Sequence, residues 1–428
     1  MSVPSLRSSV PRRVFGRSGR GLAAMACIAA LASGAVACGS GGEQSPSPSG
    51  HSAAKLRIGV LANVTGPLPS GEENAPPVLK AWAKYVNADG GISGHQVEMV
   101  VADTKGDAPT ATTAARRIAS DKSIVAVILF DAATEALIAD TITKAGLPVI
   151  GGMGYATNAW GKMPNWFPLT TSIPSIFNMG MVLGKTLGAH TTALTICAEI
   201  PGCAQAGPVV QKASESQGMK YAGTLKISSS APSHMAECLR IKKENVDYVM
   251  LGAATATAAL RVANECGQQG YTGRWGLFGG VVVPKAMREN DPGVRLDLAL
   301  NSFPWFADAP PVRRYRDVMS QQGVPEPVWG DPHSTAAYAT VELFRKALQD
   351  AVSVLPTSPG RRDVIAAYGR VTDENLGGLL PQKVTFHAGQ PAQPIACYWF
   401  GSFKSGQFGD GDLGKPVCDP PQLRAVAK

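Results

Sequence analysis

The sequence contains no apolar run long enough to cross a membrane as a helix, which takes about 20 residues. The apolar stretch Leu22–Leu31 is too short, and no later segment offers such a run. Charged residues are few as well, at 17%, whereas hydrophobic residues make up 45% of the 428 positions. We therefore expect no membrane-spanning segment and a globular body large enough for two domains.

Motifs of the common nucleotide-binding and hydrolytic enzymes are also missing. The first predicted strand-helix turn carries no GxGxxG, and the chain contains no GxxxxGK[ST] or GxSxG. The six histidines are scattered, without HExxH or paired carboxylates beside them, and no two cysteines have CxxC spacing. These absences predict a protein that is not an enzyme and that uses no cofactor and no metal.

The formal net charge of +8 at first suggests a nucleic-acid binder. Five of the arginines, however, precede Cys38 in a stretch without any acidic residue. Without them the formal charge is +3, which is unremarkable for a chain of this length. We expect no nucleic-acid partner.

Residues 1–37 have the three parts of an export signal: an arginine-bearing start, the apolar stretch Leu22–Leu31 and a run of small residues. The sequence Ala35-Val36-Ala37-Cys38 resembles the bacterial lipoprotein signal box, although Ala35 stands where leucine is usual. This resemblance implies that Cys38 is lipidated and anchors the protein to the outer face of the bacterial cytoplasmic membrane. The alternative is a cysteine that happens to lie near a cleavage site.

Arg12-Arg13-Val14-Phe15 partly matches a twin-arginine export motif, so the sequence leaves the export route open between the general and the twin-arginine pathways. Residues 38–54 are rich in glycine, serine and proline and cannot form a core. Their composition predicts a flexible tether between the anchor and the body.

Six cysteines remain after the signal region, and an even number in an exported chain favours disulfides over free thiols. Six cysteines allow 15 pairings. Proximity in the sequence favours Cys197 with Cys203, Cys238 with Cys266, and Cys397 with Cys418.

Short apolar runs rich in branched residues alternate with helical patterns along the body, which predicts α/β architecture with parallel sheets. The first series has strands over 56–61, 97–102, 124–130 and 148–150 and helices over 78–87, 109–120 and 134–144. After a proline-rich connection at 164–174, a second series has strands over 192–197, 220–227, 248–251, 275–278 and 298–303 and helices over 176–187, 206–217, 235–243 and 256–266. Helices over 310–323, 333–352 and 361–369 and a strand over 397–403 follow.

Three stretches together are similar to the leucine/isoleucine/valine-binding branch of type I periplasmic binding proteins, over nearly all of residues 55–403. They are Ile58–Pro67 with Ala88–Gly94, then Val97–Asp103 and Ile124–Phe130 with Ala145–Gly151, and finally Val246–Gly252 with Gly270–Gly273. No single stretch is specific, but their order and spacing are.

The resemblance implies two Rossmann-like lobes joined by a three-stranded hinge, with crossings near Leu169, Pro304 and Ala388. Lobe I would comprise residues 55–169 and 306–388, and lobe II residues 170–305 and 389–428. A ligand would bind beyond the carboxyl ends of the strands and be enclosed by hinge closure. The expected partners are a small-molecule solute and the permease and ATPase subunits of an ABC transporter, with the chain itself a monomer.

Candidate ligand residues of lobe I lie in loops that follow strands: Ser70, Asp131, Thr134, Gly154, Tyr155 and Thr157. The family uses such positions for the carboxylate and amine of an amino acid, which the resemblance carries to Thr134, Tyr155 and Thr157. The two threonines are equally well explained as helix N-caps. Asp131 either pairs with a cationic group or caps a helix.

Lobe II offers Glu199, Ala254 and Phe278. Here the chain departs from the family, because Gly279–Val281 occupies the place where amino-acid-binding members usually have an acidic residue for the ammonium group. Small residues at Ala253 and Ala254 replace frequent aromatic groups, which suggests a larger or non-amine ligand. Glu199 either replaces the missing carboxylate or is merely solvated, and Phe278 either stacks on the ligand or belongs to the core.

The sequence thus predicts an exported, lipid-anchored solute-binding protein for an ABC importer, with an amino acid, an amide or a small aromatic or aliphatic carboxylate as its ligand. A neutral or anionic, partly apolar compound is slightly preferred. A ligand-sensing receptor of the same fold is the first alternative, and a Rossmann-type enzyme is the second.

Overall fold

The computed structural model describes residues 53–67, 71–156, 161–199, 201–253 and 255–424. They belong to one compact unit that extends from Ser52. The predicted export signal, Cys38 and nearly all of the predicted tether lie outside the described residues, as do Ser70, Thr157 and Ala254. Within the described part of the chain, no helix is both long and apolar enough to span a bilayer.

The first sheet has five parallel strands in the order β2–β1–β3–β4–β5. They are β1 (Leu56–Ala62), β2 (Val97–Asp103), β3 (Ile124–Phe130), β4 (Val149–Ile150) and β5 (Trp166–Phe167). Every residue of β3 is buried, as its unbroken apolar sequence predicts for a strand covered on both faces. Strand β5 lies in the proline-rich segment that we expected to be a connection, because two residues are too few for a recognisable pattern.

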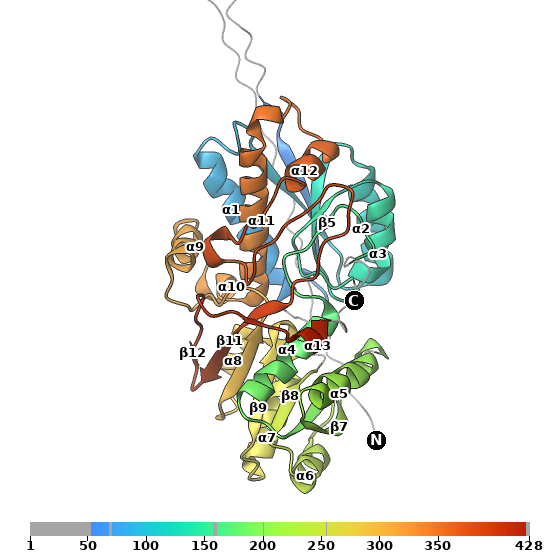
Figure 1. The fold of residues 1–428 in the computed structure, drawn as a ribbon, viewed down its shortest axis with the longest axis vertical. Helices are drawn as coiled ribbons and strands as arrows, with labels where there is room; N and C mark the ends of the chain where they lie inside the picture. Colours follow the sequence, from blue (N-terminus) through green and yellow to red (C-terminus); the bar gives the residue numbers. More distant parts are fainter. Residues whose placement is uncertain (1–52, 68–70, 157–160, 200, 254, 425–428) are drawn as a thin grey trace, which may run out of the picture. The chain divides into compact units, whose positions relative to one another are not determined.

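Helices cover both faces of the first sheet. They are α1 (Ala75–Ala88), α2 (Ala108–Ser120), α3 (Glu135–Lys144) and, from later in the chain, α11 (Pro332–Asp350). Figure 1 shows α1 beside α11 to the left of β5, and α2 beside α3 to its right. The connection from β1 to β2 moves along the sheet in one direction, and the connections from β2 to β3 and from β3 to β4 move in the other. Because such crossovers are right-handed, α1 lies on one face of the sheet and α2 and α3 lie on the opposite face.

The second sheet contains five parallel strands with antiparallel strands added at one edge, in the order β12–β11–β10–β9–β8–β6–β7. The parallel strands are β6 (Thr191–Cys197), β7 (Lys220–Ile227), β8 (Tyr248–Leu251), β9 (Arg274–Phe278) and β10 (Leu296–Leu300). Strand β11 (Cys397–Lys404) runs antiparallel to β10, and β12 (Gln407–Gly409) and β13 (Val417–Cys418) each pair antiparallel with β11. The predicted fold class, α/β with two lobes built on parallel sheets, is confirmed.

Helices α4 to α8 accompany the second sheet: α4 (Ile173–Thr186), α5 (Ala206–Ser216), α6 (Met235–Lys243), α7 (Ala256–Gln268) and α8 (Pro284–Glu289). Helix α4 packs closely on the sheet through two glycines. A Cβ at Gly184 would lie 2.8 Å from Cδ1 of Tyr248, and the hydroxyl of Tyr248 donates to the carbonyl of Gly180 at 2.8 Å. Glycine at these positions lets the helix approach a large buried tyrosine.

The remaining helices are α9 (Pro310–Gln321), α10 (Glu326–Trp329), α12 (Arg361–Tyr368) and α13 (Pro421–Arg424). Helices α9, α10 and α11 pack on α1, and α12 packs on β3, so this late segment returns to the first sheet. The chain therefore passes between the sheets before α4, before α9 and before β11. The lobe boundaries at residues 169, 305 and 388 stay predictions.

Three disulfides connect Cys197 with Cys203, Cys238 with Cys266, and Cys397 with Cys418. These are the pairs that proximity in the sequence favours. The first closes the loop after β6, the second joins α6 to α7, and the third joins β11 to β13. All three lie in elements of the second sheet.

Candidate functional site

The strand order of the first sheet reverses between β1 and β3, so the loops that leave their carboxyl ends diverge to opposite faces. Ligands of open parallel sheets bind at such switch points. The loop after β1 runs from Asn63 to the short 3-10 helix Glu72–Asn74, and the loop after β3 runs from Asp131 to α3. The corresponding reversal in the second sheet lies between β6 and β8.

Asp131 and Thr134 are both buried and bond to each other. The Thr134 hydroxyl donates to Oδ2 of Asp131, and Oδ1 of Asp131 accepts the backbone N–H groups of Ala133 at 3.0 Å and Thr134 at 3.1 Å. Thr134 occupies the N-cap position of α3, but its hydroxyl caps no helical N–H. The side chain of Thr134 therefore does not cap α3, and the Asp131 carboxylate bonds to N–H groups of its own turn before the helix begins.

Two buried glutamates, which sequence reasoning did not single out, join this turn to its neighbours. Oε1 of Glu72 accepts the N–H of Ala132 at 2.6 Å, and its Oε2 accepts the side-chain amide of Asn63 at 3.2 Å. Oε1 of Glu135 accepts the N–H of Ala156 at 2.8 Å. The two carboxyl groups thereby connect the loops after β1, β3 and β4.

Burial raises the pKa of Glu135 to about 8, and the nearby carboxylates of Glu72 and Asp131 add to this rise. The Glu135 carboxyl is therefore protonated at neutral pH in this structure. Its Oε2 is buried and has no hydrogen-bond partner among the described residues. A glutamate in the first turn of a helix usually faces solvent and the helix dipole, so its sequence position gave no sign of this burial.

Asp331 and His333 form a fully buried ion pair at the start of α11, with 3.0 Å between Oδ1 and Nδ1. Oδ1 also accepts the N–H of His333 at 2.8 Å, which caps the helix. Burial by itself lowers the pKa of His333, but the hydrogen bond and the charge of Asp331 raise it overall. Oδ2 of Asp331 and Nε2 of His333 have no partner among the described residues.

Gly71 brings the loop after β1 against this ion pair. Its φ is +93°, and a Cβ on it would lie 2.8 Å from Nδ1 of His333 and 2.9 Å from Oδ2 of Asp331. Only glycine combines that backbone conformation with so close an approach. The position of Glu72, the next residue, depends on this contact.

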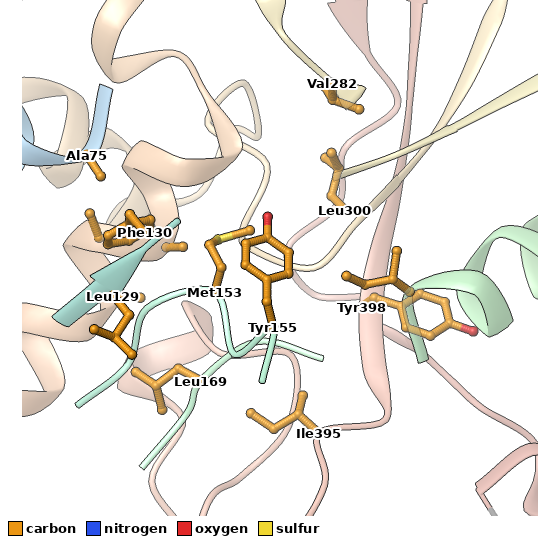
Figure 2. Packing of buried hydrophobic residues seen from close by; sticks show 14 of the residues in the cluster. Ala75, Leu129, Phe130, Met153, Tyr155, Leu169, Val282, Leu300, Ile395 and Tyr398 are labelled. Atoms are coloured by element: carbon orange, nitrogen blue, oxygen red, sulfur yellow. The ribbon is translucent and has the colours of Figure 1, made fainter. Parts of the chain in front are cut away.

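Tyr155 is close enough to four of these carboxyl groups for their charges to affect its pKa. Burial raises its pKa well above the usual value, and four carboxylates contribute to the rise: Glu72, Glu135, Asp331 and Asp131. Figure 2 shows Met153 beside the ring, with the hydroxyl pointing away from Leu169 and Ile395. Gly154, with φ of +62°, makes the turn before it. Ligand contact by Tyr155 stays a prediction, and the ring is buried among apolar side chains here.

The candidates of the second sheet lie at the carboxyl ends of β6 and β9. Glu199 is exposed, and its Oε1 accepts the Ser228 hydroxyl at 2.9 Å and the N–H of Ser229 at 2.6 Å. Partial burial raises the pKa of Glu199, but these hydrogen bonds lower it overall. Phe278 is half-buried and makes an edge contact with Phe177, with 5.7 Å between ring centroids.

Asn301, a further residue that the sequence did not reveal, follows β10 directly. Its side chain is buried, and neither amide atom has a partner among the described residues. A Cβ at Gly279 would lie 2.4 Å from Oδ1 of Asn301, so the glycine gives this amide its space. Where the family usually has an acidic residue, the chain has glycine and a neighbouring amide.

Hydrogen bonds join this end of β10 to the start of α11. The Ser302 hydroxyl donates to the carbonyl of Pro332 at 2.8 Å, and the Thr335 hydroxyl lies 2.9 Å from that of Ser302. Asn301 and the Asp331–His333 pair therefore lie near one another, although they belong to different sheets. The switch point of the first sheet and the carboxyl end of β10 meet here.

The hollows found elsewhere do not contain the predicted ligand residues. One of about 530 Å³ lies at the amino ends of β8 and β9, lined by residues that include Asp247 and Arg274. Ligands of parallel sheets bind at the opposite ends of the strands, so this hollow is not a candidate ligand site. In the described part of the chain, no three His, Cys, Asp or Glu side chains are grouped to hold a metal ion.

A family model described as periplasmic binding protein matches residues 55–407. A comparison with curated proteins gave no significant match by sequence. Among solved structures, the chain is similar to a branched-chain amino acid ABC transporter protein from Thermus thermophilus with bound valine. The identity is 16% and the TM-score 0.70, over 87% of this chain and 98% of the other.

Two further structures are similar at 16% identity and a TM-score of 0.67. One is a leucine-binding protein from Thermotoga maritima, with 85% of this chain and 99% of the other covered. The other is a fatty acid ABC transporter substrate-binding protein from Thermomonospora curvata, with 86% and 94% covered. At this identity the likenesses show a shared fold and leave the ligand open.

Proposed function

Because the chain belongs to the periplasmic binding protein family, we propose that it is a solute-binding lipoprotein that delivers a small molecule to an ABC importer. The meeting of the Asn301 end of β10 with the start of α11 carries this proposal. It brings buried, unpartnered polar atoms from two sheets to one place, as a ligand enclosed between two lobes requires.

Delivery by hinge closure follows from the three passages of the chain between the sheets. A ligand that contacts both lobes binds the closed form more tightly than the open form, and so shifts the population towards closure. The permease would then recognise the closed form. No chemistry is performed on the solute, and the protein is a carrier rather than an enzyme.

The cellular setting of the proposal comes from the amino-terminal sequence. Export directed by residues 1–37 and lipidation at Cys38 would anchor the protein at the outer face of the cytoplasmic membrane. Residues 38–54 would form a flexible tether between the anchor and the folded body. The protein would work as a monomer beside its permease and ATPase. Three disulfides in the second sheet suit an oxidising compartment.

The solute belongs to the range of amino acids, amides and small carboxylates. A thermal-shift screen of the full chain with Cys38→Ser against these classes tests the proposal, since a ligand that binds the native state raises Tm in proportion to the logarithm of its concentration. Small-angle scattering with the best compound should show a smaller radius of gyration. A folded protein that shows neither effect with any class would refute delivery by closure.

A further inference from the structure

The backbone donors at the switch point of the first sheet are already occupied by carboxyl groups of the protein itself. Four N–H groups donate to three carboxyl groups: Ala132 to Glu72, Ala133 and Thr134 to Asp131, and Ala156 to Glu135. In parallel sheets, such N–H groups near a helix start are those that hold an anionic ligand. An anion brought to this edge would meet carboxyl oxygens instead of free donors.

Among the described residues, His333 is the basic side chain that pairs with Asp331. No lysine or arginine in the described part of the chain forms an ion pair with Asp131, Glu135 or Asp331. Tyr155 contributes no charge. The carboxyl groups that follow β1 and β3 and the one at the start of α11 thus all affect one buried hydroxyl, that of Tyr155.

Independent support comes from buried atoms without partners. Oε2 of Glu135, Oδ2 of Asp331 and both amide atoms of Asn301 make no hydrogen bond in the described structure, and each of these side chains is at most 1% exposed. An unpartnered buried polar atom destabilises the folded state, so native proteins rarely keep one without a ligand or a water. Oδ2 of Asp331 and the amide oxygen of Asn301 are acceptors, and Oε2 of Glu135 becomes one when its carboxyl ionises. Nε2 of His333, beside Asp331, is also buried without a partner among the described residues.

We propose that this edge binds the cationic nitrogen group of an organic ligand, an ammonium, amidinium or guanidinium, between Glu135 and Asp331, with Glu72 beside them and the amide oxygen of Asn301 opposite. The inference rests on the proposed function and specifies that the ligand carries a cationic nitrogen group. An organic cation with several N–H donors fits acceptors spread over different loops, whereas these side chains are not grouped for a metal ion. A carboxylate of the ligand, where there is one, lies away from this edge.

The test uses the full chain with Cys38→Ser and isothermal titration at pH 7. Four sets of compounds are compared at equal concentration: diamines and guanidino or amidino compounds, carboxylates without an amine, neutral amides, and Mg²⁺ or Ca²⁺ alone. We expect binding by an organic cation, with the release of close to one proton in buffers of different ionisation enthalpy, because a bound cation ionises the Glu135 carboxyl. Glu135→Gln, which keeps the acceptor for Ala156, should abolish the proton release and weaken binding at least tenfold.

Exposed Glu289→Gln is the matched control and should change neither quantity. Binding by carboxylates, neutral amides or metal ions but by no organic cation overturns the inference, as does a cation whose affinity Glu135→Gln leaves unchanged. If one of those other solutes also reduces the radius of gyration, the proposed function is supported and only the cation site is refuted. If a cation binds as expected without any change in the radius, the cation site stands and delivery by closure fails.

Discussion

Arg288 of α8 and Glu326 of α10 form a two-bond ion pair, with N–O distances of 2.8 and 2.9 Å. Helix α8 belongs to the second sheet, whereas α10 packs with α1 and α11 on the first. Arg288 also lies over the ring of Phe408, 5.4 Å from its centroid. The pair therefore links the two lobes next to the passage of the chain before α9.

Glu326→Gln is expected to weaken ligand binding modestly by removing this link between the two lobes. Each partner is about one-third or more exposed, so the pair contributes at most about 1 kcal/mol, which corresponds to a roughly fivefold change in Kd. Titration calorimetry measures the change. Lys144→Met, which breaks an exposed pair within α3, is the control and should leave Kd unaltered.

Glu135→Gln should change how stability depends on pH. The folded-state pKa of Glu135, about 8, lies above its ordinary value of 4.5, so its stabilising contribution is complete below pH 4.5 and is lost as the pH rises towards 8. Between pH 5 and pH 8, the free energy of unfolding of the wild type should thus fall by on the order of a few kcal/mol relative to that of the variant. Urea unfolding of both proteins across this range gives the difference, and a constant difference would contradict the buried, protonated carboxyl.

Gly71→Ala should destabilise the protein more than Gly90→Ala does. Both glycines have φ near +90°, but a Cβ at Gly90 meets nothing within 4 Å, whereas at Gly71 it meets His333 and Asp331. The backbone cost of about 1–2 kcal/mol applies to both variants, and crowding adds about 1–3 kcal/mol at Gly71 alone. Chemical denaturation measures the free energy of unfolding of both variants. Equal losses of stability would show that the loop after β1 moves away from His333 and Asp331 without a free-energy cost.

Removal of the Cys238–Cys266 disulfide by a double alanine substitution should lower the free energy of unfolding by about 3 kcal/mol, because the bridge closes a loop with a sequence separation of 28 residues. Denaturant unfolding without reductant measures the loss. Non-reducing peptide mapping checks the pairing itself, and free thiols or crossed pairs in the native chain would contradict it.

Cys38→Ala should release the protein from the membrane fraction into the soluble extracytoplasmic fraction without changing its Tm, because Cys38 lies outside the compact unit that begins at Ser52. Fractionation with metabolic labelling by a fatty acid tests this. Retention of the label in the variant would refute lipidation at this cysteine.

The local pattern of the sequence was sufficient for most of the fold. Strand β7 and helix α6 begin and end at the predicted residues, and β3 was recognisable because both faces of a central parallel strand are covered and its residues are all apolar. Strand β5, with two residues, carried no such pattern, and neither did β12 and β13. Short edge strands depend on the neighbour to which they bond rather than on their own sequence.

The site was predicted less completely. Asp131, Thr134 and Tyr155 were predicted as ligand residues because each follows a strand, and the structure places them at one sheet edge, whereas their contact with a ligand stays a prediction. Glu72, Glu135 and Asn301 were missed, since nothing in a sequence distinguishes a buried glutamate or asparagine from a solvated one. The preference for a neutral or anionic solute came from Gly279–Val281 and from the small Ala253 and Ala254, whereas the carboxyl groups lie on the other lobe.

The sequence by itself determined the alternation of strands and helices, the fold class and the disulfide pairs that proximity favours, because these follow from periodicity and from short separations along the chain. Only the tertiary structure decided which polar groups share one buried place. Glu72 and Asp331 are 259 positions apart, and their proximity arises from the return of α11 to the first sheet. Burial and the charges of distant neighbours set the protonation of a carboxyl, and neither can be read from the residues next to it.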